Sequence, residues 1–547
     1  MARDMRNDGW INRVELYLTT HFALFWNLIQ LIPPLRRQIN RILINRAILR
    51  MPTRPNPLST MSSYTSWSSL TDRTFDSRHL PPALPELPDR KPPDLERTAD
   101  LFARQGDTIL CPKSTVLFAY FAQWFSDGFL RSDRGVPVDP RKNTSNHDFD
   151  LSQLYGLNSK VTQLLRTHKG GTLKSQVIDG EELPLNLCEN GVIKPEFQGL
   201  PVVRFDELST AQKNGLFAMG GDRANSQIGN TMFNVLFLRE HNRTTRLLAE
   251  EYPRWDDERL FQTARIILIL EVINVVVSEY LNHITPYHFK FFVDASAFPN
   301  ARWHRPNWMA VEFNLLYRWH GLVPSTLRIG GEDLPLRTTI YNNEMLTKRG
   351  MALMFEDASH QRAGRIGLFN TDPALREIEV QSILRGRQVQ LATYNDYRAL
   401  CRFPRVTEFD QISGDPEVQQ ALQQLYRNVE NIELYVGLFA EDLRPNSVLP
   451  SLMGRMVAVD AFSQALTTPL LAPRIFNERT FSPLGMSLIQ NTKTLSDLVH
   501  RNVSNGDSQR YFISMTRQNW QRGSSDPIPI LSGFRNRDPI STSSYPR

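Results

Sequence analysis

The chain has 547 residues, of which 41% are hydrophobic and 22% charged, and this composition is typical of a globular protein with a large buried core. Its net charge of +6 is small and spread along the chain, and no Lys/Arg block or zinc-finger spacing points to a nucleic-acid-binding class. Only three cysteines occur, Cys111, Cys188 and Cys401, so the sequence predicts neither a disulfide framework nor a Cys-rich metal site and favours a reducing compartment.

The N-terminal region is amphipathic. It begins with MARDMRNDGW, which lacks the apolar core and the cleavage site of a signal peptide. Residues 16–32 are apolar but interrupted by polar side chains and ended by two prolines, which makes them too short and too polar for a membrane-spanning helix. Arginines follow, and residues 16–71 contain no acidic side chain. Helices of this kind can lie in the lipid headgroup layer, but the pattern by itself slightly favours an ordinary N-terminal helical pair packed on the core.

The rest of the chain divides into three parts. Residues 51–95 are rich in Pro, Ser and Thr and predict an extended connector. Residues 96–505 alternate helical patterns with short loops, and the polar residues 506–547 predict an irregular tail. We expect helices at 114–131, 229–252, 256–282, 306–319 and 416–440, and a short strand at 326–329. Glu and Asn interrupt the apolar run 266–281, which therefore predicts a buried core helix, and the fold class is mainly α.

Two polar residues stand on an otherwise apolar helix near residue 120. Gln123 and Asp127 are four residues apart and share one helical face. Buried polar groups need partners, so this pair indicates a ligand, a water molecule or a polar network. A structural network is the commoner of these explanations.

Two further segments carry candidate functional residues. Arg223 precedes the sequence LREHNR (238–243) by fourteen residues, and EFNLLYRWHGLVP (312–324) contains Tyr317 and His320. If the predicted helix continues through this segment, Tyr317 and His320 lie on one face of it. A single histidine at the end of an apolar helix is more often a core residue than a metal ligand, so the residues by themselves make only a weak case for metal binding.

Three segments carry a family resemblance: FAYFAQWF (118–125), LREHNR and EFNLLYRWHGLVP. In this order and spacing they resemble the animal-type haem peroxidase–cyclooxygenase superfamily, and they are most similar to cyclooxygenase-like fatty-acid dioxygenases. Shorter matches such as VIDGE (177–181) and YHFK (287–290) extend the resemblance over residues 15–505. It implies a helical haem-dependent catalytic domain at 96–505 and a peripheral (monotopic) membrane dock formed by residues 1–50.

The resemblance also implies roles for residues on the proximal side of a haem. His320 matches the iron ligand, and Tyr435 matches a tyrosine that helps to orient that histidine. Tyr317 matches the tyrosine whose radical removes a hydrogen atom from a polyunsaturated fatty acid before O2 adds. Ser126 and Ser226 stand where the peroxidase branch has carboxylates that bond haem covalently, so we expect haem b bound non-covalently.

On the distal side the sequence departs from the family pattern. Gln123 matches the distal glutamine, but Asp127 stands where the family has its distal histidine, the group that transfers the peroxide proton. Arg223 matches the distal arginine and either stabilises the cleaving peroxide or pairs with Asp127. We therefore expect weak peroxidase turnover.

Substrate binding requires an apolar channel and a cation for the fatty-acid carboxylate. Arg46 matches the family's carboxylate-binding arginine to within one residue, with Arg50 as the alternative, and Arg349 is assigned to the second position at the channel mouth. Ser463 matches a serine that lines the channel. A Cys-rich small domain and a signal sequence like those of animal cyclooxygenases are not found in the sequence, so we expect an intracellular, membrane-associated enzyme, with a homodimer as the analogy from relatives.

The expected function is therefore a dioxygenase that converts linoleate- or arachidonate-like fatty acids to hydroperoxides. A prostaglandin-forming cyclooxygenase is a close variant. A haem peroxidase that oxidises small reductants with hydrogen peroxide, and a haem-binding or membrane scaffold without activity, are the alternatives from other classes. Chain length, stereochemistry and any cyclisation depend on the curvature of the channel, which the sequence does not specify.

Overall fold

The computed structural model describes residues 10–51, 73–83, 91–132, 138–305, 308–503 and 511–523. These residues are mainly helical and include four two-stranded antiparallel sheets, so the predicted fold class is confirmed. Most of the predicted connector and most of the predicted C-terminal tail lie outside the described residues.

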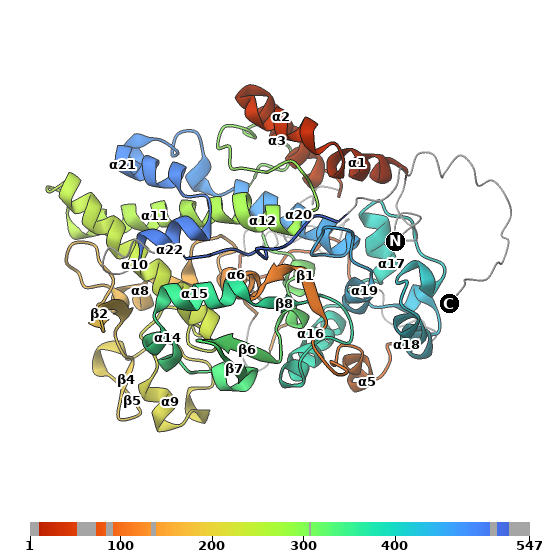
Figure 1. Cartoon of the computed structure of the whole chain (residues 1–547), viewed down its shortest axis with the longest axis horizontal. Helices are drawn as coiled ribbons and strands as arrows, with labels where there is room; N and C mark the ends of the chain where they lie inside the picture. The colour runs from red at the N-terminus through yellow and green to blue at the C-terminus, as the bar shows by residue number, and fades with distance from the viewer. Residues whose placement is uncertain are drawn as a thin grey trace.

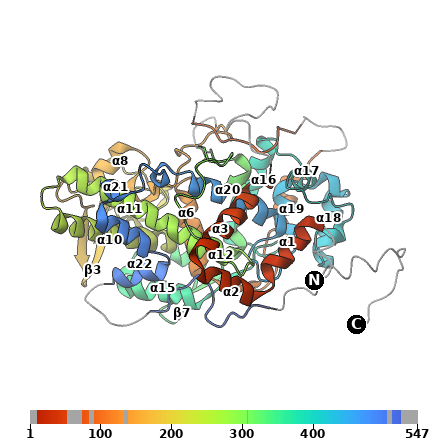
Figure 2. The same cartoon turned by 90° about the horizontal axis from the view of Figure 1, so that it is seen from above.

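Three helices at the N-terminus lie together on one side of the molecule (Figures 1 and 2): α1 (Trp10–Thr20), α2 (Ala23–Leu31) and α3 (Pro33–Ile48). Pro33 occupies the first turn of α3, where its missing N–H breaks no helical hydrogen bond. The helix α3 packs against α20 (Ser451–Leu466). Large side chains of α2 point outward, and Leu24, Leu28 and Leu31 are 80%, 63% and 77% exposed.

The long helices of the core are α10 (Ile228–Glu251) and α11 (Asp257–Val275), which pack against each other. The chain continues from α11 through a π-helical turn, Val276–Tyr280, into α12 (Leu281–Ile284). The segment Asp257–Ile284 is long and apolar enough to cross a membrane by composition, but 83% of its most apolar window is buried inside the protein. The predicted core helix at 266–281 is therefore confirmed.

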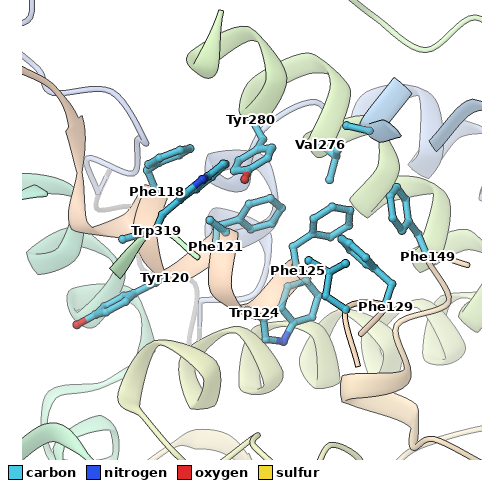
Figure 3. Packing of buried hydrophobic residues seen from close by; sticks show 14 of the residues in the cluster. Phe118, Tyr120, Phe121, Trp124, Phe125, Phe129, Phe149, Val276, Tyr280 and Trp319 are labelled. Atoms are coloured by element: carbon cyan, nitrogen blue, oxygen red, sulfur yellow. The ribbon is translucent and has the colours of Figure 1, made fainter. Parts of the chain in front are cut away.

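An aromatic cluster fixes the position of α6 (Val116–Asp127) in the centre of the fold (Figure 3). Trp124 stacks on Phe237 of α10 with ring centroids 4.4 Å apart, and Phe118 stacks on Trp319 at 6.0 Å. Aromatic rings bury a large apolar area each and prefer such offset contacts. All residues of α6 except Gln123 and Ser126 are buried, so the apolar packing leaves one polar strip of the helix accessible.

Two of the predicted helices differ from the observed ones. The segment 416–440 forms two helices, α18 (Pro416–Tyr426) and α19 (Leu434–Ala440), because Arg427 adopts a φ of 61° that ends the first of them. The segment 306–319 contains only the short helix α13 (Val311–Leu316). The expected strand is present as β6 (Thr326–Ile329), paired with β7 (Glu332–Pro335).

The remaining elements are short and surround this core. The helices are α5 (Leu95–Asp100), α7 (Ser152–Tyr155), α8 (Ser159–Leu165), α9 (Thr210–Asn214), α14 (Glu344–Arg349), α15 (Met351–His360), α16 (Arg376–Gln388), α17 (Tyr394–Leu400), α21 (Glu478–Asn491) and α22 (Leu495–Arg501). The strand pairs are β1 (Leu110–Thr115) with β8 (Arg362–Gly364), β2 (Ser175–Ile178) with β3 (Glu181–Pro184), and β4 (Cys188–Glu189) with β5 (Val192–Ile193).

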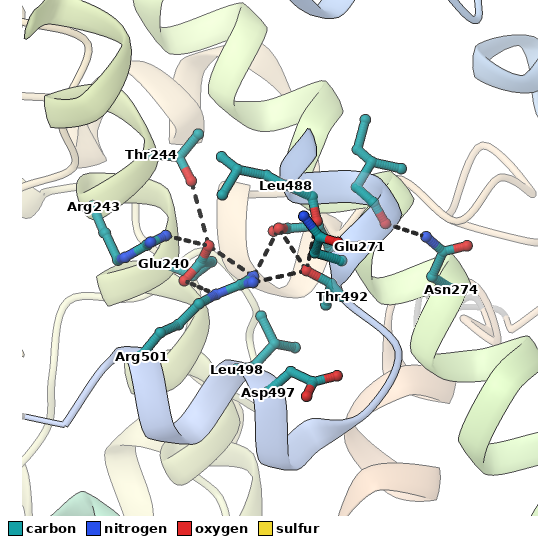
Figure 4. Close-up of polar contacts among 12 residues, drawn as sticks. Glu240, Arg243, Thr244, Glu271, Asn274, Leu488, Thr492, Asp497, Leu498 and Arg501 are labelled. Atoms are coloured by element: carbon teal, nitrogen blue, oxygen red, sulfur yellow. Dashed lines mark hydrogen bonds and ion pairs between the residues drawn. The ribbon is translucent and has the colours of Figure 1, made fainter. Parts of the chain in front are cut away.

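A buried ionic network ties α22 to α10 and α11 (Figure 4). Arg501 lies 2.9 Å from Glu240 and 2.7 Å from Glu271, and both carboxylates are fully buried. Burial and the neighbouring charge of Glu240 raise the pKa of Glu271 to about 7. The guanidinium of Arg501 therefore bridges two carboxylates that would otherwise oppose folding, and Arg243 adds a second cation at 3.3 Å to Glu240 alone.

Substitution of Arg501→Met should destabilise the protein strongly. It leaves Glu271 buried without its cation, and removal of one partner from a buried ion pair costs about 3–5 kcal/mol. The matched control is Arg246→Met, since Arg246 is 57% exposed in its 3.2 Å pair with Glu182 and such pairs contribute less than about 1 kcal/mol. Thermal denaturation followed by circular dichroism should show a much lower melting temperature for Arg501→Met only. Equal shifts for the two variants would contradict this account.

Candidate functional site

Tyr317 and His320 do not share a helical face, contrary to the prediction. The helix α13 ends at Leu316, the backbone at Trp319 has φ −87° and ψ 51°, and His320 begins the 3-10 turn His320–Leu322. The break in the helix lets Tyr317 and His320 point in directions that a continuous helix would not allow.

The His320 ring is held by a buried carboxylate. Its Nδ1 lies 2.9 Å from Oε1 of Glu379, a residue of α16 that is 1% exposed. The same oxygen accepts a hydrogen bond from Thr371 at 2.7 Å, and the other carboxylate oxygen accepts one from the Tyr435 hydroxyl at 2.6 Å. A carboxylate acceptor places the ring proton on Nδ1. This arrangement leaves Nε2 of His320 available to bind a metal ion.

The charge of Glu379 is stabilised although the residue is buried. Burial raises the pKa of this carboxyl, but the opposing effects of His320, Tyr435 and Thr371 are larger and hold it below its usual range. Tyr435 was predicted from the family resemblance, whereas Glu379 and Thr371 were not. The sequence does place Glu379 next to the apolar Val380, and the structure buries both in α16.

Tyr317 lies in an aromatic setting. Its ring stacks on Trp319 at 4.6 Å and meets the edge of Phe313 at 5.0 Å. Burial raises the pKa of the phenol well above its usual value, with a smaller opposing effect from the hydroxyl of Tyr280. Tyr280 belongs to the π-helical turn after α11, a geometry that is frequent at functional sites. Tyr317 therefore keeps its proton throughout the physiological pH range.

Asp127 is bound by two arginines. Its Oδ1 accepts a hydrogen bond of 2.6 Å from Arg223 and lies 3.7 Å from the Arg131 guanidinium. Arg131 also forms a 2.6 Å ion pair with Asp222. Arg223 thus adopts the second of its two expected roles, the ion pair with Asp127. Charge-assisted bonds of this length hold a carboxylate in one orientation.

Gln123 reaches the accessible side of α6 together with Ser126. The amide oxygen of Gln123 accepts a 2.8 Å hydrogen bond from Gln227. Ser126 and Ser226 use their hydroxyls to bond backbone oxygens, those of Gln123 and Arg223. Neither serine has a carboxylate group, so neither can form the ester bond by which a carboxylate side chain links haem covalently.

A separate cavity lies between the N-terminal helices and α20. Its walls include Arg50, Arg444 and Arg455, together with Tyr287 and Phe462. Burial, together with the positive charges of Arg50 and Arg444, lowers the pKa of Arg455 to about 9. Three guanidiniums thus surround a partly apolar space, which suits the carboxylate of an amphipathic ligand.

Of the predicted substrate residues, only Arg50 lines this cavity. Arg46 is 51% exposed, with Nε 2.9 Å from Glu15, and does not line the cavity, whereas Arg50 pairs with Glu15 inside it. Arg349 is not brought to the cavity, because a 2.9 Å ion pair holds it against Asp357 of α15. Ser463 is buried in α20 beside the lining residue Phe462.

The wall position next to the three arginines is filled by Tyr287 rather than by Arg349. Tyr287 belongs to the YHFK segment, so its motif was noted while its role was missed.

The comparisons with known proteins agree on one family. The model of the animal haem peroxidase family matches residues 123–513. Prostaglandin G/H synthase 2 of Equus caballus is 31% identical over 503 residues, and the alignment covers 89% of this chain and 80% of the relative. Prostaglandin G/H synthase 1 of Mus musculus is 31% identical over 497 residues with the same coverage.

Two solved structures share the fold. A fatty acid alpha-dioxygenase of Oryza sativa, determined with palmitic acid, superposes with a TM-score of 0.66 at 19% identity and covers 90% of this chain and 94% of its own. Peroxidase A of Dictyostelium discoideum superposes with a TM-score of 0.63 at 20% identity and covers 79% of this chain and 92% of its own.

The residues present fit a haem. His320 offers one protein ligand to a haem iron through Nε2, and within the described part of the chain no three His, Cys, Asp or Glu side chains gather into a metal site. Arg318 offers a partner for an anionic edge. The buried Nε of the Arg318 guanidinium donates to no described acceptor. Among the described residues, the guanidinium donates one hydrogen bond, to Asn314 at 2.7 Å. Burial and the nearby charge of Arg385 lower the pKa of Arg318 to about 10. A carboxylate such as a haem propionate would compensate this charge.

Substitution of Arg318→Gln should therefore weaken haem binding through the propionates alone. A charge-assisted hydrogen bond contributes about 1.5–3 kcal/mol, which corresponds to roughly a 10- to 100-fold loss of affinity. Titration of the apoprotein followed by the Soret band should show this loss for haem but not for haem dimethyl ester, which has no propionate charge. Arg349→Gln is the matched surface control. Unchanged haem affinity in Arg318→Gln would contradict the assignment.

Proposed function

This chain belongs to the animal haem peroxidase family, and we propose that it is a haem-dependent dioxygenase that adds O2 to a polyunsaturated fatty acid and releases the hydroperoxide. The observation that carries the proposal is the geometry of Tyr317, a protonated phenol enclosed by aromatic rings three residues before His320. The similar proteins support a lipid substrate, since they include prostaglandin synthases and a fatty acid alpha-dioxygenase determined with palmitic acid.

In this mechanism His320 would hold the haem iron, and Tyr317 reacts with the substrate. A bound haem oxidised by a hydroperoxide would supply the oxidising power to remove one electron and one proton from the phenol, with the peroxide as their final acceptor. The Tyr317 phenoxyl radical then takes a hydrogen atom from a methylene between two double bonds, which leaves a carbon radical on the fatty acid. O2 adds to that carbon, and the peroxyl radical takes the hydrogen atom back from Tyr317 to give the hydroperoxide. Phe313 and Trp319 pack against the Tyr317 ring at 5.0 and 4.6 Å and reduce its contact with water.

The distal residues favour release of this product. A general acid–base group must gain and lose a proton within each cycle. Asp127 is held between the guanidiniums of Arg223 and Arg131, so it would have to leave both of them to transfer a proton. The proposal therefore gives Asp127 a structural role next to the haem, bound non-covalently because Ser126 and Ser226 supply no carboxylate.

The N-terminal helices give the substrate a route from a membrane surface. The outward leucines of α2 form an exposed apolar strip, and helices of this kind insert into the headgroup region. The cavity with Arg50 lies directly behind α1 and α3. We infer that α1–α3 dock on a membrane and that Arg50, rather than Arg46, receives the fatty-acid carboxylate.

Substitution of Tyr317→Phe should abolish oxygen uptake with linoleic acid while haem stays bound, because the hydrogen-abstracting hydroxyl is lost. Oxygen consumption by the haem-loaded wild type, with mass spectrometry of the product, should give a hydroperoxide rather than an alcohol. Oxidation of a phenolic reductant is the internal control, since it needs no tyrosyl radical. If the variant consumes oxygen at the wild-type rate, the dioxygenase mechanism is wrong; rapid reduction of the product to the alcohol would overturn the role given to Asp127.

Substitution of Arg50→Gln should raise the KM for linoleate about 10-fold or more, given 1.5–3 kcal/mol for a charge-assisted hydrogen bond. Arg46→Gln is the matched control four residues earlier, and its half-exposed side chain should make little difference. The methyl ester of linoleic acid, which has no charge, should be insensitive to both changes. A larger effect at Arg46 than at Arg50 would reverse the assignment.

A further inference from the structure

We propose that Glu379 acts as a positioning residue that strengthens electron donation from His320 to the iron and so lowers the reduction potential of the bound haem. The inference rests on the proposed function, because it requires His320 to be the iron ligand. It goes beyond that function by stating how Glu379 changes the electron donation of His320.

Glu379 directs its negative charge at His320. Among the described residues no Lys or Arg nitrogen lies within 4.0 Å of this carboxylate, and its ion-pair partner is His320. A buried negative charge without a cation acts strongly on the hydrogen bond that it accepts, because the surrounding dielectric is low. The 2.9 Å bond from Nδ1 therefore transmits this charge to the imidazole.

Such a bond also affects the other nitrogen of the ring. A carboxylate that accepts from the outer N–H of a metal-bound histidine raises the basicity of the ligand. A neutral amide or carbonyl at the same place would do so less. A more basic His320 stabilises ferric over ferrous iron, which favours the oxidised states from which Tyr317 is activated.

Two hydroxyls control this charge. Tyr435 and Thr371 donate to Glu379 at 2.6 and 2.7 Å, and each bond withdraws part of the charge that would act on His320. The ring of Tyr435 is fixed in turn, since it stacks on Phe102 at 5.1 Å and contacts Phe439 at 4.9 Å. The Glu379 carboxylate therefore lowers the reduction potential of the haem, and the two hydroxyls that donate to it raise that potential.

Opposite changes in potential provide the test. Spectroelectrochemical titration of the haem-loaded full-length protein should give a more positive ferric/ferrous midpoint for Glu379→Gln and a more negative one for Tyr435→Phe and Thr371→Val. The iron–histidine stretching frequency of the ferrous form should fall in Glu379→Gln. Arg349→Gln is the surface control and should leave both values unchanged.

The variant His320→Ala distinguishes a failure of the role proposed for Glu379 from a failure of iron ligation by His320. Loss of the iron–histidine band in this variant, with unchanged midpoints in the three others, would overturn the role of Glu379 and leave the proposed function intact. Retention of that band in His320→Ala would refute ligation by His320 itself. If Glu379→Gln fails to fold, as circular dichroism would reveal, the single-hydroxyl variants still decide the matter: no negative shift in either of them contradicts the proposal.

Discussion

The candidate reaction centre depends on one buried carboxylate. Glu379 is withdrawn from water, and a buried carboxylate is stable only when its oxygens are hydrogen-bonded. Its donors come from three separate segments: His320 from the turn after α13, Thr371 from the segment after β8, and Tyr435 from α19. Satisfying this one charge therefore fixes the relative positions of four chain segments and, with them, the direction of His320 Nε2.

The carboxylate predicted for the distal side follows the same constraint with a different outcome. Asp127 is also a buried carboxylate, but arginines rather than neutral donors compensate it. A charge neutralised by two guanidiniums has little effect on its surroundings, whereas the charge of Glu379 acts on a histidine. Arg318 lies within the electrostatic reach of both Glu379 and Arg223. A cofactor with a dianionic edge would complete the balance among these groups.

Much of the fold and part of the site could be predicted from local pattern. The spacing of Gln123 and Asp127 on an apolar helix, and the apolar run at 266–281, were readable because helical periodicity is local. The split of 416–440 was not, since it depends on the single left-handed residue Arg427 within an otherwise helical pattern.

Glu379 was not predicted from the sequence, because its contact with His320 also depends on the tertiary fold. Glu379 meets His320 across 59 residues of sequence, a pairing that no local pattern encodes. Resemblance supplied Tyr317 and His320 but misassigned the mouth of the cavity to Arg349, whose charge Asp357 already satisfies. The end of α13 at Leu316 likewise depends on tertiary packing around Trp319, not on the propensities of its neighbours.

The cavity behind the N-terminal helices shows how substrate binding and fold stability can use the same charges. Arg50 already holds the carboxylate of Glu15 from α1. A fatty-acid carboxylate that entered there would replace one carboxylate by another on the same guanidinium, so the cation would not be left uncompensated. Glu15 would keep its second partner, Arg46 of α3 at 2.9 Å, so the contact between α1 and α3 would survive the exchange.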